Sequence, residues 1–502
     1  MKTNENQWIP LVLLYLKAAR HKVQNMLQHE DIAKTHEIKG KFNKVWLSSD
    51  YLQAYLNILG FNKIKNRFSW CKKDGFSFES LISTLLILPI TGMKSIHEFT
   101  TNKDNELEQC GKDSYYRILA NQKINWRSFL AQFIKQYLVK DQNFTPSLDT
   151  TKCLIFDDTD LPKTGKTMEG VSKIYNHVSK TFYLGFKLLV AGYWNGSVFI
   201  PIDFSLHRES KTSKLKYGLT AKQRKAQKNT PRCSTTVAAK RYKELNKKKT
   251  DLVVQMFSRG VKRKIPVDYI LMDNWFTSIG LLKKLRNISE LTHIIGMYKY
   301  NSKMEVDLKI TSTSKLKKQK KKPKRCRKLG YYYHHYITEI DGLKVAVFLV
   351  KRGQNGKWQT LITTDTALKF VKAIEVYSIR WSIEVFFKEA KQLFGLGKCQ
   401  STNFDVQIAQ ITITMTQYLL TSIRYRMEAY ETIGGLFKDL KQDYIENKLN
   451  IRILAVVNQI ITLLEKLVDS IDIEIITSKI IENIESYGFL INTHSFKDQV
   501  VE

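Results

Sequence analysis

Features that mark several other classes of protein are missing from this sequence. Its cysteines occur singly, without a Cys-x-x-Cys pair, which argues against a zinc ribbon and against a disulfide framework. Scattered thiols fit a reducing compartment, so we expect a cytoplasmic protein. Thr164–Thr167 resembles the end of a nucleotide-binding loop, but Asp160 stands where that motif requires glycine. The sequence therefore excludes a nucleoside triphosphatase of the P-loop type.

Long uninterrupted apolar runs are also missing. Leu81–Ile90 is too short to cross a bilayer, and Ile451–Val468 is interrupted by charged and amide side chains. The short apolar stretch Ile9–Leu16 has no clear small-residue cleavage site after it, which argues against a signal peptide. We expect a protein with no membrane partner.

Acidic residues are scarce relative to basic ones. The chain has 81 Lys and Arg against 47 Asp and Glu, which gives a formal net charge of +34. Such an excess favours a polyanionic partner, most commonly nucleic acid. Compositional drift is an alternative explanation, because Lys, Ile and Asn are all abundant. Charge alone does not distinguish an enzyme from a DNA-binding module or a ribosome-associated protein.

The 502 residues are too many for one ordinary core, so several structural units are expected. Residues 1–145 have helical apolar spacing, and Phe76–Phe99 suits either a helix–turn–helix or an ordinary helical bundle. Strand-length apolar runs then follow, separated by a basic, helix-prone stretch. They are Cys153–Phe156, Phe182–Tyr193, Val198–Phe204, Tyr269–Met272 and His293–Tyr298. This order predicts an α/β fold, a mixed sheet flanked by helices.

A second, β-rich block interrupts the α/β region. We divide the chain into a helical N-terminal region (1–145), an α/β domain in two parts (146–300 and 366–430), a β-rich insertion (301–365) and a helical C-terminal region (431–502). The insertion contains the densest basic run of the chain, Lys315–Lys328. Such a run is either a solvated, mobile loop or an arm that contacts phosphates, and the two are compatible.

Two aspartates stand in equivalent places after short apolar strands. Asp157 follows Cys153–Phe156, and Asp273 follows Tyr269–Met272. In open sheets covered by helices, ligand sites gather at the carboxyl ends of strands, so neighbouring strands would bring both carboxylates together. Each pattern alone is equally typical of an aspartate that caps a turn. Asp158 adjoins Asp157, but only one of them can face the site, because successive strand residues point to opposite faces.

A third acidic residue lies in a polar stripe of a predicted helix. At about 100° per residue, Tyr377, Arg380, Glu384 and Lys391 fall within a stripe about 60° wide. Large apolar residues occupy the rest of this helix. The stripe fits either an acid presented to a site or a solvent-facing ion pair between Arg380 and Glu384.

These residues carry a resemblance to a known family. Tyr377, Arg380, Glu384 and Lys391 match the Y-(2)-R-(3)-E-(6)-K motif of bacterial insertion-sequence transposases of family four, within the DDE superfamily. Phe156–Thr159 resembles the first-aspartate motif of this family, and Met272–Phe276 resembles its second. Leu361–Asp365 is similar to the strand that ends the insertion before the glutamate helix. The resemblance covers about residues 150–425 and implies an RNase H-like fold with an all-β insertion.

The resemblance also implies a function and a set of residue roles. Asp157, Asp273 and Glu384 are expected to be catalytic and to bind two Mg²⁺ or Mn²⁺ ions, which oxygen-only ligands favour. Tyr377, Arg380 and Lys391 are expected to contact DNA phosphates. Of the two adjacent aspartates, Asp157 aligns better with the motif.

The expected partners are double-stranded DNA with terminal inverted repeats, target DNA and a second copy of the chain in a homodimer that pairs two ends. The expected reaction is cut-and-paste transposition, and the relatives suggest excision through hairpin ends. A nuclease that has lost joining, or a DNA-binding protein that never cuts, are the alternatives. Trp275, Phe276 and Trp381 are candidates for stacking on DNA bases, although at least two of them are expected to pack in the core.

Overall fold

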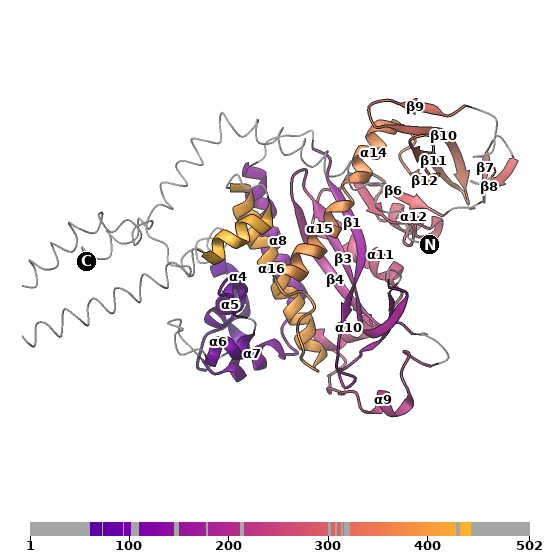
Figure 1. The fold of residues 1–502 in the computed structure, drawn as a ribbon. Helices are drawn as coiled ribbons and strands as arrows, with labels where there is room; N and C mark the ends of the chain where they lie inside the picture. The colour runs from indigo at the N-terminus through magenta and orange to yellow at the C-terminus, as the bar shows by residue number, and fades with distance from the viewer. Residues whose placement is uncertain are drawn as a thin grey trace, which may run out of the picture. The chain divides into compact units, whose positions relative to one another are not determined.

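A computed structural model describes residues 61–72, 74–93, 95–101, 110–144, 150–176, 179–210, 215–299, 303–306, 309–312, 315, 322–427 and 432–442 (Figure 1). Within these ranges, Leu119–Met415 form one unit, and the residues before and after them form a second. The predictions for Ile9–Leu16 and Ile451–Val468, and for most of the two terminal regions, concern residues outside the described ranges. The central part of the basic run Lys315–Lys328 also lies outside the described ranges.

The second unit is helical. Its helices are α4 (Phe61–Phe68), η2 (Ser69–Cys71), α5 (Phe78–Ile87), α6 (Ile96–Thr101) and α7 (Lys112–Leu119), with a further helix at residues 433–442. The side chain of Ser77 caps α5 by accepting a hydrogen bond from the backbone of Ser80. A turn at residues 88–92 follows α5, where the sequence predicts a break near Pro89–Gly92.

The first unit is built on a mixed sheet. Its first strands are β1 (Cys153–Pro162), β2 (Ser172–Asn176), β3 (Thr181–Trp194), β4 (Phe199–His207), β5 (Tyr269–Met272) and β6 (His293–Tyr298). Strand β1 pairs antiparallel with β3 and parallel with β5, β3 pairs antiparallel with β4, and β5 pairs parallel with β6. The resulting order β4–β3–β1–β5–β6 is that of an RNase H-like sheet. The predicted mixed α/β fold is confirmed.

Helices cover both faces of this sheet. The helices in contact with strands of the sheet are α8 (Trp126–Phe144), α10 (Val237–Glu244), α11 (Lys249–Lys262), α14 (Phe370–Ser378) and α15 (Trp381–Gln392). The chain also forms α9 (Ala221–Lys225), α12 (Ile279–Arg286) and α16 (Phe404–Met427). Phe386 of α15 stacks on Phe199 of β4 on one face. A β-bulge beyond Pro201 reverses the side-chain alternation, so Asp203 of the same strand reaches Arg259 of α11 on the other face.

Buried ion pairs fix three helices to β4. Arg127 of α8 donates to Asp203 and to Glu244 of α10, each at 2.9 Å, and Arg259 of α11 donates to Asp203 at 2.7 Å. These arginines hold the pKa of Asp203 far below its usual value, despite the opposing effect of burial. Each charge has a partner, which limits the free-energy cost of burying it.

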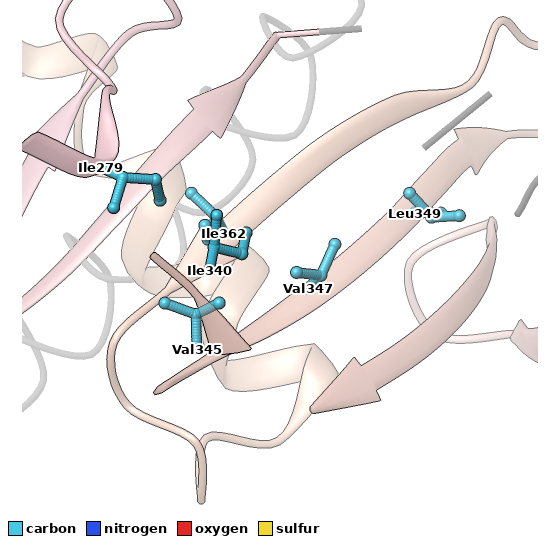
Figure 2. Packing of buried hydrophobic residues seen from close by; sticks show 6 residues of the cluster. All are labelled: Ile279, Ile340, Val345, Val347, Leu349 and Ile362. Carbon is cyan, nitrogen blue, oxygen red and sulfur yellow. The ribbon is translucent and has the colours of Figure 1, made fainter. Parts of the chain in front are cut away.

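The residues between β6 and α14 extend the same sheet. Their strands are β7 (Lys303–Val306), β8 (Lys309–Ser312), β9 (Lys324–Cys326), β10 (Tyr331–Ile340), β11 (Leu343–Arg352) and β12 (Gln359–Thr363). Strand β12 pairs antiparallel with β6, so the extension is hydrogen-bonded to the first six strands. Its apolar core includes Ile279, the first residue of α12, together with Ile340, Val345, Val347, Leu349 and Ile362 (Figure 2).

Gly296 of β6 leaves the space that the loop after Asp273 needs. A Cβ atom at Gly296 would overlap the side-chain oxygen of Thr277. We predict that Gly296→Ala lowers the free energy of unfolding by about 1–3 kcal/mol, because the added methyl group overpacks this region. Denaturant titration of the full chain measures the change.

Gly280→Ala is the matched control, since a methyl group added at this position of α12 would meet no atom within 4 Å. That variant should leave the free energy of unfolding unchanged or raise it by about 0.5–1 kcal/mol, because alanine favours the helical conformation more than glycine does. Equal stability of the two variants would contradict the proposed close approach of Gly296 and Thr277.

Candidate functional site

The parallel pairing of β1 with β5 brings the first two acidic residues together. The last paired residues are Phe156 and Met272, so Asp157 and Asp273 follow at the same level of the sheet. The sequence predicts a short strand that ends at Phe156, but β1 continues to Pro162 by pairing with β3. Asp157 therefore lies inside a strand, at the point where its parallel neighbour ends.

Backbone hydrogen bonds orient Asp273. Its Oδ1 accepts from the backbone N–H groups of Trp275 and Phe276, at 3.0 and 3.1 Å. The N–H and the hydroxyl of Thr277 both donate to its carbonyl oxygen. The carboxylate is thus held at the start of the turn after β5. A capping aspartate and a site aspartate, which the sequence leaves as alternatives, are here the same residue.

The two adjacent aspartates of β1 point to opposite faces of the sheet. Asp157 Oδ2 accepts from Arg380, at the start of α15, at 3.0 Å. Asp158 Oδ2 accepts from Lys249, the first residue of α11, at 2.6 Å. Of the two, Asp157 is therefore the one on the same face as Glu384.

The predicted glutamate helix is interrupted. The sequence predicts one continuous helix through Tyr377–Lys391, but α14 ends at Ser378 and α15 begins at Trp381. Hydrogen bonds from residue i to residue i−3 tighten the chain here: Arg380 N–H donates to Tyr377 and Ile383 N–H donates to Arg380. This tight turn carries Arg380, whose side chain extends toward the carboxylates.

Arg380 links two of the three predicted acids. One terminal nitrogen lies 3.0 Å from Asp157 Oδ2 and the other lies 2.6 Å from Glu384 Oε1. The side chains of Arg380, Asp157 and Glu384 are 10%, 15% and 26% exposed. The ion pair between Arg380 and Glu384, one of the two alternatives for the polar stripe, is thus formed at the edge of the sheet and not in open solvent.

The electrostatics of the site follow from burial and from crowded negative charge. Burial raises the pKa of Asp157 well above its usual value; the charge of Arg380 opposes this, and the carboxylates of Asp273, Asp158 and Glu384 add to it. Burial also raises the pKa of Asp273. Burial disfavours the charge of Arg380, but Tyr377 and the carboxylates outweigh that effect and raise its pKa. The negative charges of all three acids therefore favour the charged form of the Arg380 guanidinium group.

The remaining predicted residues lie along the same helices. Lys391 donates to the hydroxyl of Thr159 at 2.7 Å, and its burial lowers its pKa. Tyr377 is only 5% exposed, and the guanidinium of Arg380 lies 6.0 Å from the centre of its ring. Thr159 follows Asp157 by two residues on β1, so Lys391 and Arg380 contact the same face of this strand.

A family described as DDE superfamily endonuclease matches residues 81–334, half of the chain. The chain belongs to the DDE superfamily endonuclease family. No curated protein matches the sequence. The match includes Asp157 and Asp273 and ends within β10, before Glu384.

DDE superfamily endonucleases act on DNA and generally use divalent metal ions. Within the ranges that the structure describes, no three His, Cys, Asp or Glu side chains are close enough to form a ready metal site. The guanidinium of Arg380 lies between Asp157 and Glu384 and is a cation in contact with both. The oxygen donors fit hard divalent ions, but Arg380 has to move away from them before an ion can bind both.

The structure adds Lys249, a residue that the sequence did not indicate. Lys249 pairs with Asp158 and lies 4.8 Å from the ring centre of Trp275. Trp275 is 52% exposed, whereas Phe276 is fully buried against it. The spacing of Lys249 gave no signal, because it is one of many lysines in a basic stretch.

In the described part of the DDE endonuclease chain, no helix is both long and apolar enough to span a bilayer.

Arg380 should stabilise the site in the absence of divalent ions. We predict that Arg380→Gln lowers the free energy of unfolding by about 1–3 kcal/mol in a chelator, because two poorly hydrated carboxylates lose their partner. Thermal and denaturant unfolding measure this.

Lys328→Gln is the control for removing one cation from an ion pair. Lys328 lies 3.4 Å from Glu375 with its side chain 72% exposed, so the change should stay within about 0.5 kcal/mol. Equal effects of the two substitutions would show that the Arg380 ion pairs contribute no more than a surface pair.

Proposed function

We propose that the chain is a transposase of the insertion-sequence family four branch, which cleaves the ends of its element and joins them to target DNA. The observation that carries this proposal is the contact of Asp157 and Glu384 with Arg380, with Asp273 at the same level of the sheet as Asp157, in a DDE endonuclease with an RNase H-like sheet. The match of Tyr377, Arg380, Glu384 and Lys391 to the motif of that branch supports the finer assignment.

The three carboxylates are the proposed ligands of two Mg²⁺ or Mn²⁺ ions. Two such metal ions, when bound, activate the attacking oxygen and stabilise the leaving oxygen in a phosphoryl displacement. Backbone hydrogen bonds to Asp273 Oδ1 fix the direction of its carboxylate, and the β1–β5 pairing fixes Asp157 beside it. Glu384 completes the set from α15. Each acid thus comes from a different element of a rigid framework.

Arg380, Lys391 and Tyr377 are the proposed contacts of the scissile phosphate. A guanidinium that pairs with carboxylates in the absence of a ligand has the fork geometry that a phosphate accepts. Exchange of Arg380 from the carboxylates to a phosphate would free Asp157 and Glu384 for divalent ions. Lys391 lies on the same face of β1 through Thr159 and would contact a neighbouring phosphate.

The charge of the chain supports the proposed partners. A formal net charge of +34 attracts DNA over distances comparable with the Debye length. The proposed substrates are the terminal inverted repeats of the element and a target duplex. A homodimer that pairs two ends is the proposed assembly, and the joining step uses the 3′-hydroxyl that the first cut releases.

Cleavage of end DNA by acid-site variants tests this function. Asp157→Asn, Asp273→Asn and Glu384→Gln should each lower the cleavage rate at least about a thousandfold, because several kcal/mol of transition-state stabilisation depend on the bound ions. Asp158→Asn is the matched control, since Asp158 pairs with Lys249 on the other face. It should retain most of the activity.

Calorimetric titration with Mn²⁺ supplies a readout that does not depend on catalysis. The three acid-site variants should bind Mn²⁺ more weakly than the Asp158→Asn control. Normal cleavage by all three variants would rule out the proposed site. Cleavage without joining by the unmodified chain would instead identify a nuclease.

Trp275 is the exposed aromatic residue nearest to the acids in sequence, and we propose that it stacks on a base beside the cut. Trp275→Ala should weaken binding of end DNA about fivefold to a hundredfold, the range for loss of one stacked base. Phe182, which is 53% exposed on β3, provides the control substitution Phe182→Ala. Equal affinities in a fluorescence anisotropy titration would show that Trp275 does not contact DNA.

A further inference from the structure

Basic and aromatic side chains alternate on one face of the β-rich extension. Arg325 of β9 lies 5.8 Å from the ring centre of Tyr332 of β10, and Lys351 of β11 lies 5.4 Å from the same ring. Lys351 also lies 5.3 Å from the ring of Trp358, which stacks on His334 at 5.4 Å. We call Arg325, Tyr332, Lys351, Trp358 and His334 the cation–aromatic ladder.

Strand register places the ladder on a single face. Tyr332 pairs directly with Arg325 on one side and with Lys351 on the other, and directly paired residues share a face. The alternate residues Tyr331 and Tyr333 point the other way, where Tyr333 stacks on Phe370 of α14 at 3.8 Å. The opposite face is thus used for packing inside the protein.

Packing accounts for only part of the ladder. Trp358 lies against the apolar core of the extension, and His334 is 8% exposed. Arg325, however, is exposed, and Tyr332, Lys351 and Trp358 are half-buried. Lys351 is held in place by a hydrogen bond to the carbonyl of Gln354 at 2.7 Å. Two cations over ring faces are more than the core requires.

Acidic residues are missing around the ladder. The sequence has no Asp or Glu from residue 322 to 338 or from 343 to 364, whereas Lys324, Arg327 and Arg352 add positive charge there. Lys328, in the first of these segments, forms an ion pair with Glu375. A cation held over an aromatic ring keeps its charge, so the ladder presents positive potential on segments that contain no Asp or Glu.

We propose that the cation–aromatic ladder binds an unpaired strand of DNA. Single-stranded nucleic acid is bound by positive grooves that follow the phosphates and by aromatic rings on which bases stack. Arg325 and Lys351 supply the charge, and Tyr332 and Trp358 supply the rings. That the strand is DNA rests on the proposed function, since cutting and joining expose unpaired ends.

Fluorescence anisotropy with a labelled single-stranded DNA oligonucleotide tests the proposal on the full chain. The double variant Arg325→Gln/Lys351→Gln should reduce the slope of log affinity against log salt by about 0.7 for each phosphate that is no longer neutralised. Tyr332→Leu should weaken binding about fivefold to a hundredfold, because one base no longer stacks on a ring. Trp358 is left unchanged because it packs on the core.

A charge-matched control comes from the same part of the fold. Lys283 of α12 and Lys344, near the start of β11, are exposed and lie outside the ladder. The double variant Lys283→Gln/Lys344→Gln removes the same charge and should keep the single-strand affinity within about twofold, as expected for surface sites that do not touch the strand. Thermal unfolding verifies that all variants fold. If the double variant Arg325→Gln/Lys351→Gln does not fold, Arg325→Gln alone, at an exposed position, replaces it in the test.

The outcomes separate this proposal from the proposed function. Equal loss of affinity in the ladder and control variants would overturn the ladder, as would an equal loss for duplex and single-stranded DNA. Tighter binding of an RNA oligonucleotide of the same sequence would identify an RNA surface instead. The Asp157→Asn chain should bind the single strand normally while it fails to cut. If the unmodified chain binds through the ladder but never cleaves end DNA, the proposed function fails and the ladder stands.

Discussion

The parallel pairing of β1 with β5 is the constraint on which the site depends. It ends at Phe156 and Met272, and the next residue on each strand is an aspartate. The alternation of side chains on β1 then sends Asp157 to the face covered by α15 and Asp158 to the face where α11 begins. A shift of one residue in this register would exchange the two aspartates and direct the wrong carboxylate to Arg380.

Arg380 balances the negative charge that this pairing concentrates. Carboxylates held close together repel one another and favour protonation, unless a cation lies among them. The tight turn between α14 and α15 provides that cation, and the same turn gives Arg380 an i,i+4 partner in Glu384. A continuous helix would also pair Arg380 with Glu384, so the interruption does not create that pair. It directs the guanidinium toward Asp157 as well. The arrangement makes the acid site stable as a folded structure before any ligand binds.

The general fold was predictable because its signals are local. Apolar runs of strand length predicted β1, β3, β4, β5 and β6, and their order around a helical stretch predicted the mixed sheet. The extent of β1 was not predictable, because Asp157, Asp158 and Asp160 are poor strand residues that pair only because β3 lies beside them. The break at Ile379–Arg380 was also missed, since helical periodicity continues across it.

The sequence by itself determined which residues we propose for the chemistry: three acids in order, a polar stripe around Glu384 and a large excess of positive charge. These properties depend on residue identity and spacing along the chain. Only the tertiary structure decided which of Asp157 and Asp158 shares a face with Glu384, that Arg380 contacts the carboxylates, and that Arg325, Tyr332, Lys351 and Trp358 form one surface. Those facts depend on strand register and on contacts between residues distant in sequence, which local patterns do not encode.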